Sequence, residues 1–216
     1  MELTNKTVCF LGDSITEGAG ASHVDNCFVS LFGAKYPDAH VYNFGIGGTR
    51  IARQAIPSEC DRWDKHFSSR IEEMPESADL ICVFGGTNDF GHGDARFGSF
   101  GDTTDDSFFG ALYDLSQKLV NKYPFAKIVF FTPLHRETEN NIAKRPDGCF
   151  VLEDYVNAIK ENAAYFSLPV LDLWSVSEMQ PALPIIKETF MPDGLHPNDA
   201  GYVKLFQTVD SFIEKL

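Results

Sequence analysis

The chain has 216 residues, of which 44% are hydrophobic and 23% charged, a composition typical of a soluble globular protein and not of a disordered one. Because this length suits one domain of ordinary size and no repeat, low-complexity tract or linker divides it, we expect a single domain over residues 1–216. The formal net charge of −13 argues against a nucleic-acid or anionic-membrane partner, since both need a basic surface.

The five cysteines are odd in number, scattered along the chain and without a CxxC pair. Cys9 and Cys82 stand inside apolar runs, where cysteine usually serves as a small core residue. No apolar run is long enough to cross a bilayer, and the first residues lack the basic cap and apolar stretch of a signal peptide. We therefore expect a reduced, cytoplasmic setting, with no metal site and no cofactor.

Short apolar runs alternate with amphipathic segments, a pattern typical of an α/β fold with a parallel sheet. Strands are expected at residues 7–11, 40–44, 80–84, 127–131 and 169–173. Helical stripes follow Ser107, which can cap the first of them, and also span residues 152–166 and 202–216. Several strands are apolar on both faces, as expected when helices cover both sides of a sheet.

Two stretches, residues 91–106 and 135–150, have no clear periodicity. Long irregular loops in a compact domain are often functional, so both are candidates for shaping a pocket.

Glycine-rich or polar motifs follow three of the expected strands. Residues 12–18 (GDSITEG) follow the first strand, residues 45–50 (GIGGTR) the second and residues 86–89 (GTND) the third, while residues 193–198 (DGLHPN) precede the last helix. Because open α/β sheets bind ligands at the carboxyl ends of their strands, we expect the fold to gather these motifs at one edge.

These motifs contain the groups that a serine needs to attack an ester: a base, a group that orients the base, and donors for the oxyanion. Ser14 stands at a strand-to-helix turn, where its hydroxyl can project. Asp193 and His196 are three residues apart, so a bent loop can present the carboxylate to one imidazole nitrogen while the other faces Ser14. Gly48 and Asn88 are expected to offer a backbone N–H and a side-chain amide to the oxyanion.

Each motif also has a simpler interpretation. Taken alone, a Gly-Asp-Ser run is usually a turn with a helix cap, and paired glycines are usually a tight loop. An Asn-Asp pair is usually a turn or a cap, and an Asp and a His three residues apart usually lie in a solvated loop. Their joint occurrence, in this order and mostly at strand ends, favours catalysis.

In that combination the sequence resembles the SGNH hydrolases, also called the GDSL-type esterases and lipases. The family's GDSxTxG block is matched by residues 12–18, its GxND block by residues 86–89 and its DxxH block by residues 193–196. The glycine of its second block fits Gly48 best, although Gly45 and Gly47 compete for that place.

The resemblance implies an α/β fold, a flavodoxin-like three-layer α/β/α sandwich with a five-stranded parallel sheet, in agreement with the strand count. It also implies Ser14 as the nucleophile, His196 as general base and then acid, and Asp193 as the orienting carboxylate. The implied oxyanion donors are the N–H groups of Ser14 and Gly48 and the side chain of Asn88.

The implied activity is hydrolysis of an ester through an acyl-enzyme, with short acyl groups such as acetyl, carried by a carbohydrate, as the expected substrate. A lysophospholipase or thioesterase acting on longer acyl chains is the alternative with the same chemistry. A flavin- or nucleotide-binding flavodoxin-like module is disfavoured, because the chain has no GxxxxGK[ST] or GxGxxG run. The expected partner is a small-molecule ester, with no nucleic acid and no membrane, and a homo-oligomer stays open.

Four residues near the motifs are candidates for substrate contacts: Asp13, Arg50, His92 and His135. For the aspartate we expect hydrogen bonds to the loops around the serine, and for the arginine either a substrate group or a surface ion pair. The two histidines follow strand ends, where they can line the pocket or serve the structure. Trp63 and Trp174 offer surface for stacking on a sugar, although such residues are more often core anchors.

Overall fold

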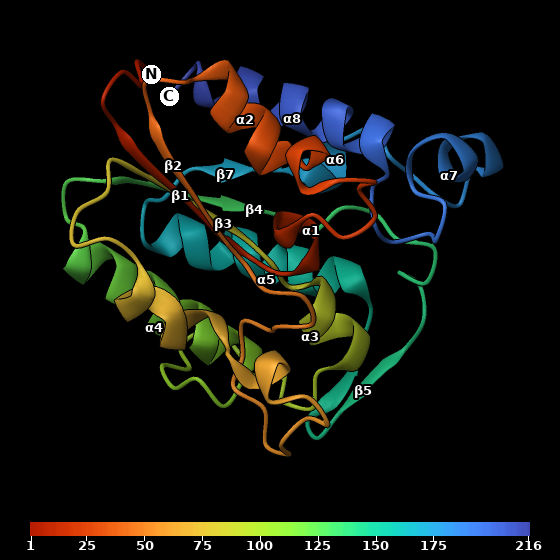
Figure 1. The fold of residues 1–216 in the computed structure, drawn as a ribbon. Helices are drawn as coiled ribbons and strands as arrows, with labels where there is room; N and C mark the ends of the chain where they lie inside the picture. The colour runs from red at the N-terminus through yellow and green to blue at the C-terminus, as the bar shows by residue number, and fades with distance from the viewer.

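The computed structural model describes residues 1 to 216 and places five parallel strands in one sheet, in the order β2-β1-β3-β4-β7 (Figure 1). The strands are β1 (Thr7–Gly12), β2 (His40–Gly45), β3 (Leu80–Phe84), β4 (Lys127–Phe131) and β7 (Val170–Leu171). In the sheet register, Gly12 lies opposite both Gly45 and Phe84, and Phe84 lies opposite Phe131. Four strands therefore end in one row, and the loops that follow them leave the sheet at the same edge.

Helices cover both faces of the sheet, as Figure 1 shows. On one face α2 (Phe28–Lys35) packs beside α8 (Asp199–Ile213), and on the other α4 (Phe108–Lys122) packs against α5 (Leu152–Tyr165) and the 3₁₀ helix η3 (Phe67–Glu73). The three-layer arrangement with a five-stranded parallel sheet that the sequence predicted is confirmed.

The core is divided by the sheet into two apolar clusters, one under each helical layer. Side chains on opposite faces of the sheet belong to different clusters. Cys9 of β1 packs on the α4–α5 side, and Cys82 of β3 packs on the α2–α8 side. Both cysteines are fully buried, as predicted, and all five cysteines are free. This two-sided burial explains why β1, β3 and β4 are apolar at nearly every position, whereas the edge strand β2 is more exposed and carries polar residues.

The predicted strands and helices differ from the observed ones mainly at their ends. β7 has two residues where five were expected, because Asp172 turns out of the sheet toward Thr132 and Lys160 and α6 (Leu173–Val176) begins directly after it. The predicted cap of α4 is present, since the Ser107 hydroxyl accepts the N–H of Gly110 over 3.1 Å.

The stretch 135–150, expected to be irregular, contains the antiparallel hairpin of β5 (Ala143–Arg145) and β6 (Gly148–Phe150). The helix α2 was not predicted from the sequence. The remaining short elements are α1 (Ser14–Glu17), η1 (Val24–Asn26), η2 (Asp61–Asp64), α3 (Thr87–His92) and α7 (Pro184–Phe190).

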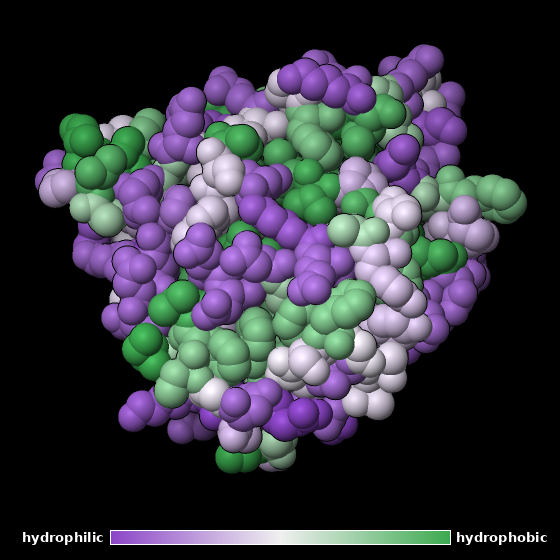
Figure 2. Space-filling view, turned by 180° about the vertical axis from the view of Figure 1, so that it is seen from behind, coloured by the Kyte–Doolittle hydropathy of each residue, from purple (hydrophilic) through white to green (hydrophobic).

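The surface is mixed in character. In the space-filling view from behind, hydrophilic residues surround separate apolar patches (Figure 2). None of the helices combines the length and the apolar character that a membrane span requires.

Candidate active site

Ser14 stands at the junction between the strand β1 and the helix α1. The preceding residue, Asp13, caps that helix, because its carboxylate accepts a hydrogen bond from the backbone N–H of Ile15 over 3.0 Å. Since β1 lies between β2 and β3 in the sheet, the loops that follow both neighbouring strands flank Ser14.

His196 lies between Ser14 and Asp193. Its Nε2 atom is 2.9 Å from the Ser14 hydroxyl oxygen, and its Nδ1 atom is 2.7 Å from Oδ2 of Asp193. The other oxygen of Asp193 accepts the backbone N–H groups of Leu195 and His196, over 2.8 and 2.7 Å. Desolvation alone would raise the pKa of Asp193, but the hydrogen bonds from His196 and Leu195 hold it below its ordinary value. The carboxylate is therefore charged at neutral pH, and it orients the imidazole.

Tyr202 joins the loop that carries His196 to the loop that carries Ser14. It lies in the first turn of α8 and is fully buried. Its hydroxyl is 3.1 Å from the carbonyl oxygen of Ile15 and 2.7 Å from that of Ala19. The start of the last helix is thereby held against the start of α1, which brings the imidazole to the serine.

The three glycines that competed for the oxyanion role differ in their hydrogen bonds. The N–H of Gly45 donates to the Asn43 side chain over 2.8 Å, and the N–H of Gly47 donates to the Glu17 carboxylate over 2.7 Å. The N–H of Gly48 has no partner in the protein, and its φ of 78° is one that favours glycine. Gly48 is thus the glycine of this loop whose N–H is available to a ligand.

Asn88 and Asp89 open α3 and hold the segment that follows the glycine loop. The Asn88 side-chain amide donates one N–H to the carbonyl oxygen of Thr49 over 3.0 Å, which leaves its second N–H for a ligand. The Asp89 carboxylate accepts the backbone N–H groups of residues 51 and 52, both over 2.9 Å. Burial raises the pKa of Asp89 to about 6. The second and third motifs are therefore tied to each other by side-chain hydrogen bonds.

Arg70, on η3, is a buried cation that the sequence analysis did not single out. Its guanidinium donates to the carbonyl oxygens of Gly12 and Phe44, at the carboxyl ends of β1 and β2, and to the Thr49 hydroxyl. Burial lowers the pKa of Arg70 to about 10. A lone arginine in a segment without periodicity gives no sequence signal for this role.

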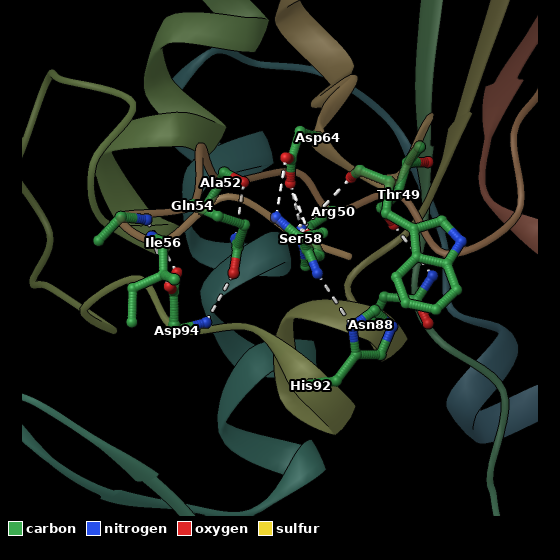
Figure 3. A network of polar contacts seen from close by, with 12 residues as sticks. Thr49, Arg50, Ala52, Gln54, Ile56, Ser58, Asp64, Asn88, His92 and Asp94 are labelled. Atoms are coloured by element: carbon green, nitrogen blue, oxygen red, sulfur yellow. Dashed lines mark hydrogen bonds and ion pairs between the residues drawn. The ribbon is translucent and has the colours of Figure 1, made fainter. Parts of the chain in front are cut away.

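Two of the four predicted substrate contacts are buried. Asp13 is 1% exposed, and burial raises the pKa of its carboxyl to about 7. Arg50 is 3% exposed and donates to the Ser58 hydroxyl over 2.6 Å, to Asp64 over 3.1 Å and to the ring of His92 over 3.0 Å (Figure 3). The contacts that the structure shows for both residues are within the protein, and the ion pair of Arg50 with Asp64 is partly buried.

His92 lies at the end of α3, where its ring meets Arg50 and, at 5.9 Å between centroids, Trp63. Desolvation and the neighbouring charges of Arg50 and Arg136 lower the pKa of His92 to about 4, so the ring is neutral at pH 7. Trp63 is 40% exposed and is not a core anchor. Its indole covers Gly48, since a Cβ built on that glycine would lie 2.4 Å from Cδ1 of the ring.

His135 turns to a different group of residues. Its ring stacks on Trp174 with 3.8 Å between centroids, and its Nδ1 atom is 2.8 Å from Glu139. None of its hydrogen bonds is to a residue of the four motifs, so its contacts in the structure are with Glu139 and Trp174.

The match to known proteins agrees with this geometry. The model of the GDSL-like Lipase/Acylhydrolase family matches residues 10–204 of the chain. The chain belongs to this family. Because this is a family of lipases and acylhydrolases, the protein is a GDSL-like hydrolase.

Solved structures similar to this GDSL-like hydrolase share its fold. One is 34% identical, with a TM-score of 0.86 over 100% of this chain and 99% of the other. A protein from Lactobacillus plantarum is 29% identical, with a TM-score of 0.82 over 99% of both chains. A two-domain esterase active on acetylated mannans is 22% identical, with a TM-score of 0.63 over 98% of this chain and 49% of the other. No curated protein matches the chain.

Proposed function

We propose that this GDSL-like hydrolase cleaves carboxylic esters through an acyl-enzyme formed on Ser14. The observation that carries the proposal is the chain of two short contacts through His196, to the Ser14 hydroxyl at 2.9 Å and to Asp193 at 2.7 Å. A serine, an imidazole and a carboxylate joined in this order are the parts of a nucleophilic acyl transfer.

In the first half of the reaction, Nε2 of His196 takes the Ser14 proton while the hydroxyl oxygen attacks the ester carbonyl carbon. The oxyanion is held by the N–H groups of Ser14 and Gly48 and by the free amide N–H of Asn88. The alcohol then leaves with the proton from His196. In the second half, water attacks the acyl-enzyme by the same route and releases the acid.

We propose short acyl groups, acetyl above all, as the part that is removed. The indole of Trp63 lies over Gly48 beside the proposed oxyanion site and leaves little room for a long chain there. A carbohydrate as the alcohol is supported by the exposed aromatic face of Trp63 and by the similarity to the esterase active on acetylated mannans. We further propose that one domain acts in the cytoplasm on a small ester, without nucleic acid, membrane or cofactor.

The test compares the purified protein with its Ser14→Ala variant on aryl esters of increasing acyl length and on acetylated oligosaccharides. We expect Ser14→Ala to abolish hydrolysis and labelling by an organophosphonate while the melting temperature is unchanged. Esterase activity retained by this variant would rule out Ser14 as nucleophile. A preference for long fatty acyl chains would instead favour a lysophospholipase or thioesterase.

A further inference from the structure

Arg136 lies between two loops of the candidate active site. Its Nη1 atom donates to the carbonyl and hydroxyl oxygens of Thr87, at 3.2 and 3.3 Å, directly before Asn88. The next residue, Glu137, donates its backbone N–H to the carbonyl oxygen of Gly194 over 2.8 Å, inside the loop that carries His196. The Arg136 side chain therefore starts beside the histidine loop and ends beside the proposed oxyanion donor.

A missing side chain on α3 makes room for this guanidinium. A Cβ built on Gly91 would lie 2.8 Å from Nη1 of Arg136 and 3.7 Å from Nη2. The guanidinium also lies over the ring of Phe90, 5.5 Å from its centroid. It is thus held against α3 rather than extended into solvent.

The charge of Arg136 has no carboxylate partner within 4.0 Å, in a chain with 31 acidic and 18 basic side chains. The two glutamates nearest in sequence do not pair with the guanidinium: Glu137 pairs with Lys187 at 2.7 Å. Glu139 accepts from His135, from Gln180 and from the backbone N–H of Arg136. Nη2 of Arg136 makes no hydrogen bond with the protein, while Nε donates to Thr138 and Nη1 to Thr87.

The other six arginines are bound either by carboxylates or by backbone carbonyl oxygens. Four of the seven are paired with carboxylates: Arg50, Arg53, Arg62 and Arg96. Arg70 and Arg145 donate to backbone carbonyl oxygens. An arginine with a partly exposed guanidinium and an unused N–H pair, held against the residue that precedes Asn88, is suited to an anionic ligand, since the planar guanidinium recognises carboxylate and phosphate groups.

The surroundings of Arg136 favour an anion as well. His92, on the same helix as Gly91, is neutral, and the charges of three arginines, Arg50, Arg136 and Arg145, act on its ring. Of these three arginines, Arg50 is paired with Asp64, whereas Arg136 and Arg145 have no carboxylate within 4.0 Å. The carboxylates of Asp13 and Asp193 act on Arg136 from a longer distance and do not reach it as ion pairs.

We propose that Arg136 is a specificity-determining residue that binds an anionic group, a carboxylate or a phosphate, carried by the ester substrate. This role rests on the proposed ester hydrolysis and specifies that the ester substrate is anionic. Nη2 donates to the anionic group while Nη1 keeps its contact with Thr87. The charged group thereby positions the ester carbonyl relative to Ser14 and takes no part in the bond changes.

The test uses pairs of esters that differ in charge. On the alcohol side, para-acetoxybenzoate is compared with para-acetoxybenzamide, and para-acetoxyphenyl phosphate tests a phosphate. On the acyl side, the mono-para-nitrophenyl ester of glutaric acid is compared with para-nitrophenyl pentanoate. Each is measured with the wild type, with Arg136→Gln and Arg136→Lys, and with Arg96→Gln as the control, because Arg96 is an exposed arginine.

We expect kcat/KM of the wild type to be higher for an anionic ester than for its neutral counterpart. Arg136→Gln should lower the value for the anionic ester by about tenfold to a hundredfold, mainly through KM, and change that for the neutral ester by less than about twofold. Arg136→Lys should fall between, and Arg96→Gln should match the wild type. The pair that shows the effect tells whether the anion belongs to the acyl or the alcohol side.

Equal rates for charged and neutral esters in the wild type would overturn the proposal, and so would an equal loss for both in Arg136→Gln. If no ester is hydrolysed by the wild type, the proposed function fails, and binding of para-hydroxybenzoate, measured by calorimetry, then decides the anion site independently. Should Arg136→Gln not fold, competitive inhibition of the wild type by benzoate but not by benzamide supports the proposal, and equal inhibition overturns it.

Discussion

The Glu17 carboxylate accepts the backbone N–H of Gly47 over 2.7 Å, although Glu17 ends the helix that follows β1 and Gly47 lies in the loop that follows β2. The same carboxylate is paired with Arg62, which directly precedes Trp63. Glu17 therefore fixes both the glycine loop and the segment that covers it. Because the N–H of Gly47 is occupied, the N–H of Gly48 is the one left to face a substrate.

Replacing Glu17 should damage catalysis without touching the triad. In Glu17→Ala the N–H of Gly47 loses its acceptor, and the loop loses the contact that sets the direction of the Gly48 N–H. We expect kcat for an aryl acetate to fall by about tenfold to a hundredfold, because small misplacements of an oxyanion donor are costly. Steady-state kinetics measure the loss. Glu76→Ala, an exposed glutamate on the loop before β3, is the matched control, and equal activity of both variants would contradict this role.

Gly48→Ala should remove activity through a steric clash. The matched variant Gly101→Ala separates this clash from the effect of backbone strain. Gly48 has a φ of 78°, and its Cβ would collide with the indole of Trp63 at 2.4 Å. Gly101 also has a positive φ, 105°, but a Cβ there would meet nothing within 4 Å. Both variants should lose about 1 kcal/mol of stability from backbone strain, while only Gly48→Ala should lose about a hundredfold in kcat/KM.

Urea unfolding and kinetics on the same aryl acetate measure the two effects separately. The double variant Gly48→Ala with Trp63→Ala should recover part of the activity, since the colliding ring is gone. If Gly101→Ala is as inactive as Gly48→Ala, the loss comes from general destabilisation and not from the contact with Trp63.

The motifs predicted the site well because the sheet does most of the positioning. Once β1, β2 and β3 are recognised, parallel strands with aligned ends bring Ser14, Gly48 and Asn88 to one edge. The position of His196 is harder to predict from the sequence. His196 reaches the serine because Tyr202, in the last helix, hydrogen-bonds the carbonyl oxygen of Ile15. That contact joins residues 187 positions apart and leaves no local pattern.

The elements that were missed have short or ambiguous patterns. The strands β5 and β6 have three residues each, too few for an alternation to be read. Arg70 and Arg136 were missed for another reason. A buried or cradled arginine is defined by the oxygens around it, and these come from distant strands and helices. The same applies to Arg50 and Asp13, whose burial the sequence did not predict.

Asp13 should make stability depend on pH. Its pKa is raised from 3.8 to about 7, so between these values the folded protein holds a proton that the unfolded chain has lost. Its contribution to stability is therefore fully present below pH 3.8 and is lost as pH rises to about 7. Asp13→Asn keeps a side-chain oxygen for the N–H of Ile15 but does not ionise. We expect the variant to gain stability relative to the wild type as pH rises through this window.

The measurement is urea unfolding of both proteins at a series of pH values. Asp89 is also buried, but it is present in both proteins, so its own pH dependence cancels to first order in the difference between their unfolding free energies. Asp38→Asn, at an exposed position, is the control substitution. A difference between Asp13→Asn and wild type that stays constant with pH would show that folding does not shift the pKa of Asp13.

Arg70 should be the most sensitive of the buried cations to substitution, because it serves two strands at once. Arg70→Met leaves the carbonyl oxygens of Gly12 and Phe44 without their donor and removes the positive charge that acts on Asp13. We expect unfolding free energy to fall by about 3 kcal/mol, whereas Arg53→Met, at an arginine whose side chain is 53% exposed, should change it by less than about 0.5 kcal/mol.

The loss in Arg70→Met should also depend on pH, with a sign that follows from Asp13. Near pH 5 the Asp13 carboxyl is protonated in the folded protein and does not need the arginine charge, whereas near pH 8 it is ionised and does. Urea unfolding at the two pH values should therefore show a larger loss at the higher one. In the background of Asp13→Asn this difference should disappear; a loss that is equal at both pH values in the wild-type background would mean that Arg70 acts through the carbonyl oxygens alone.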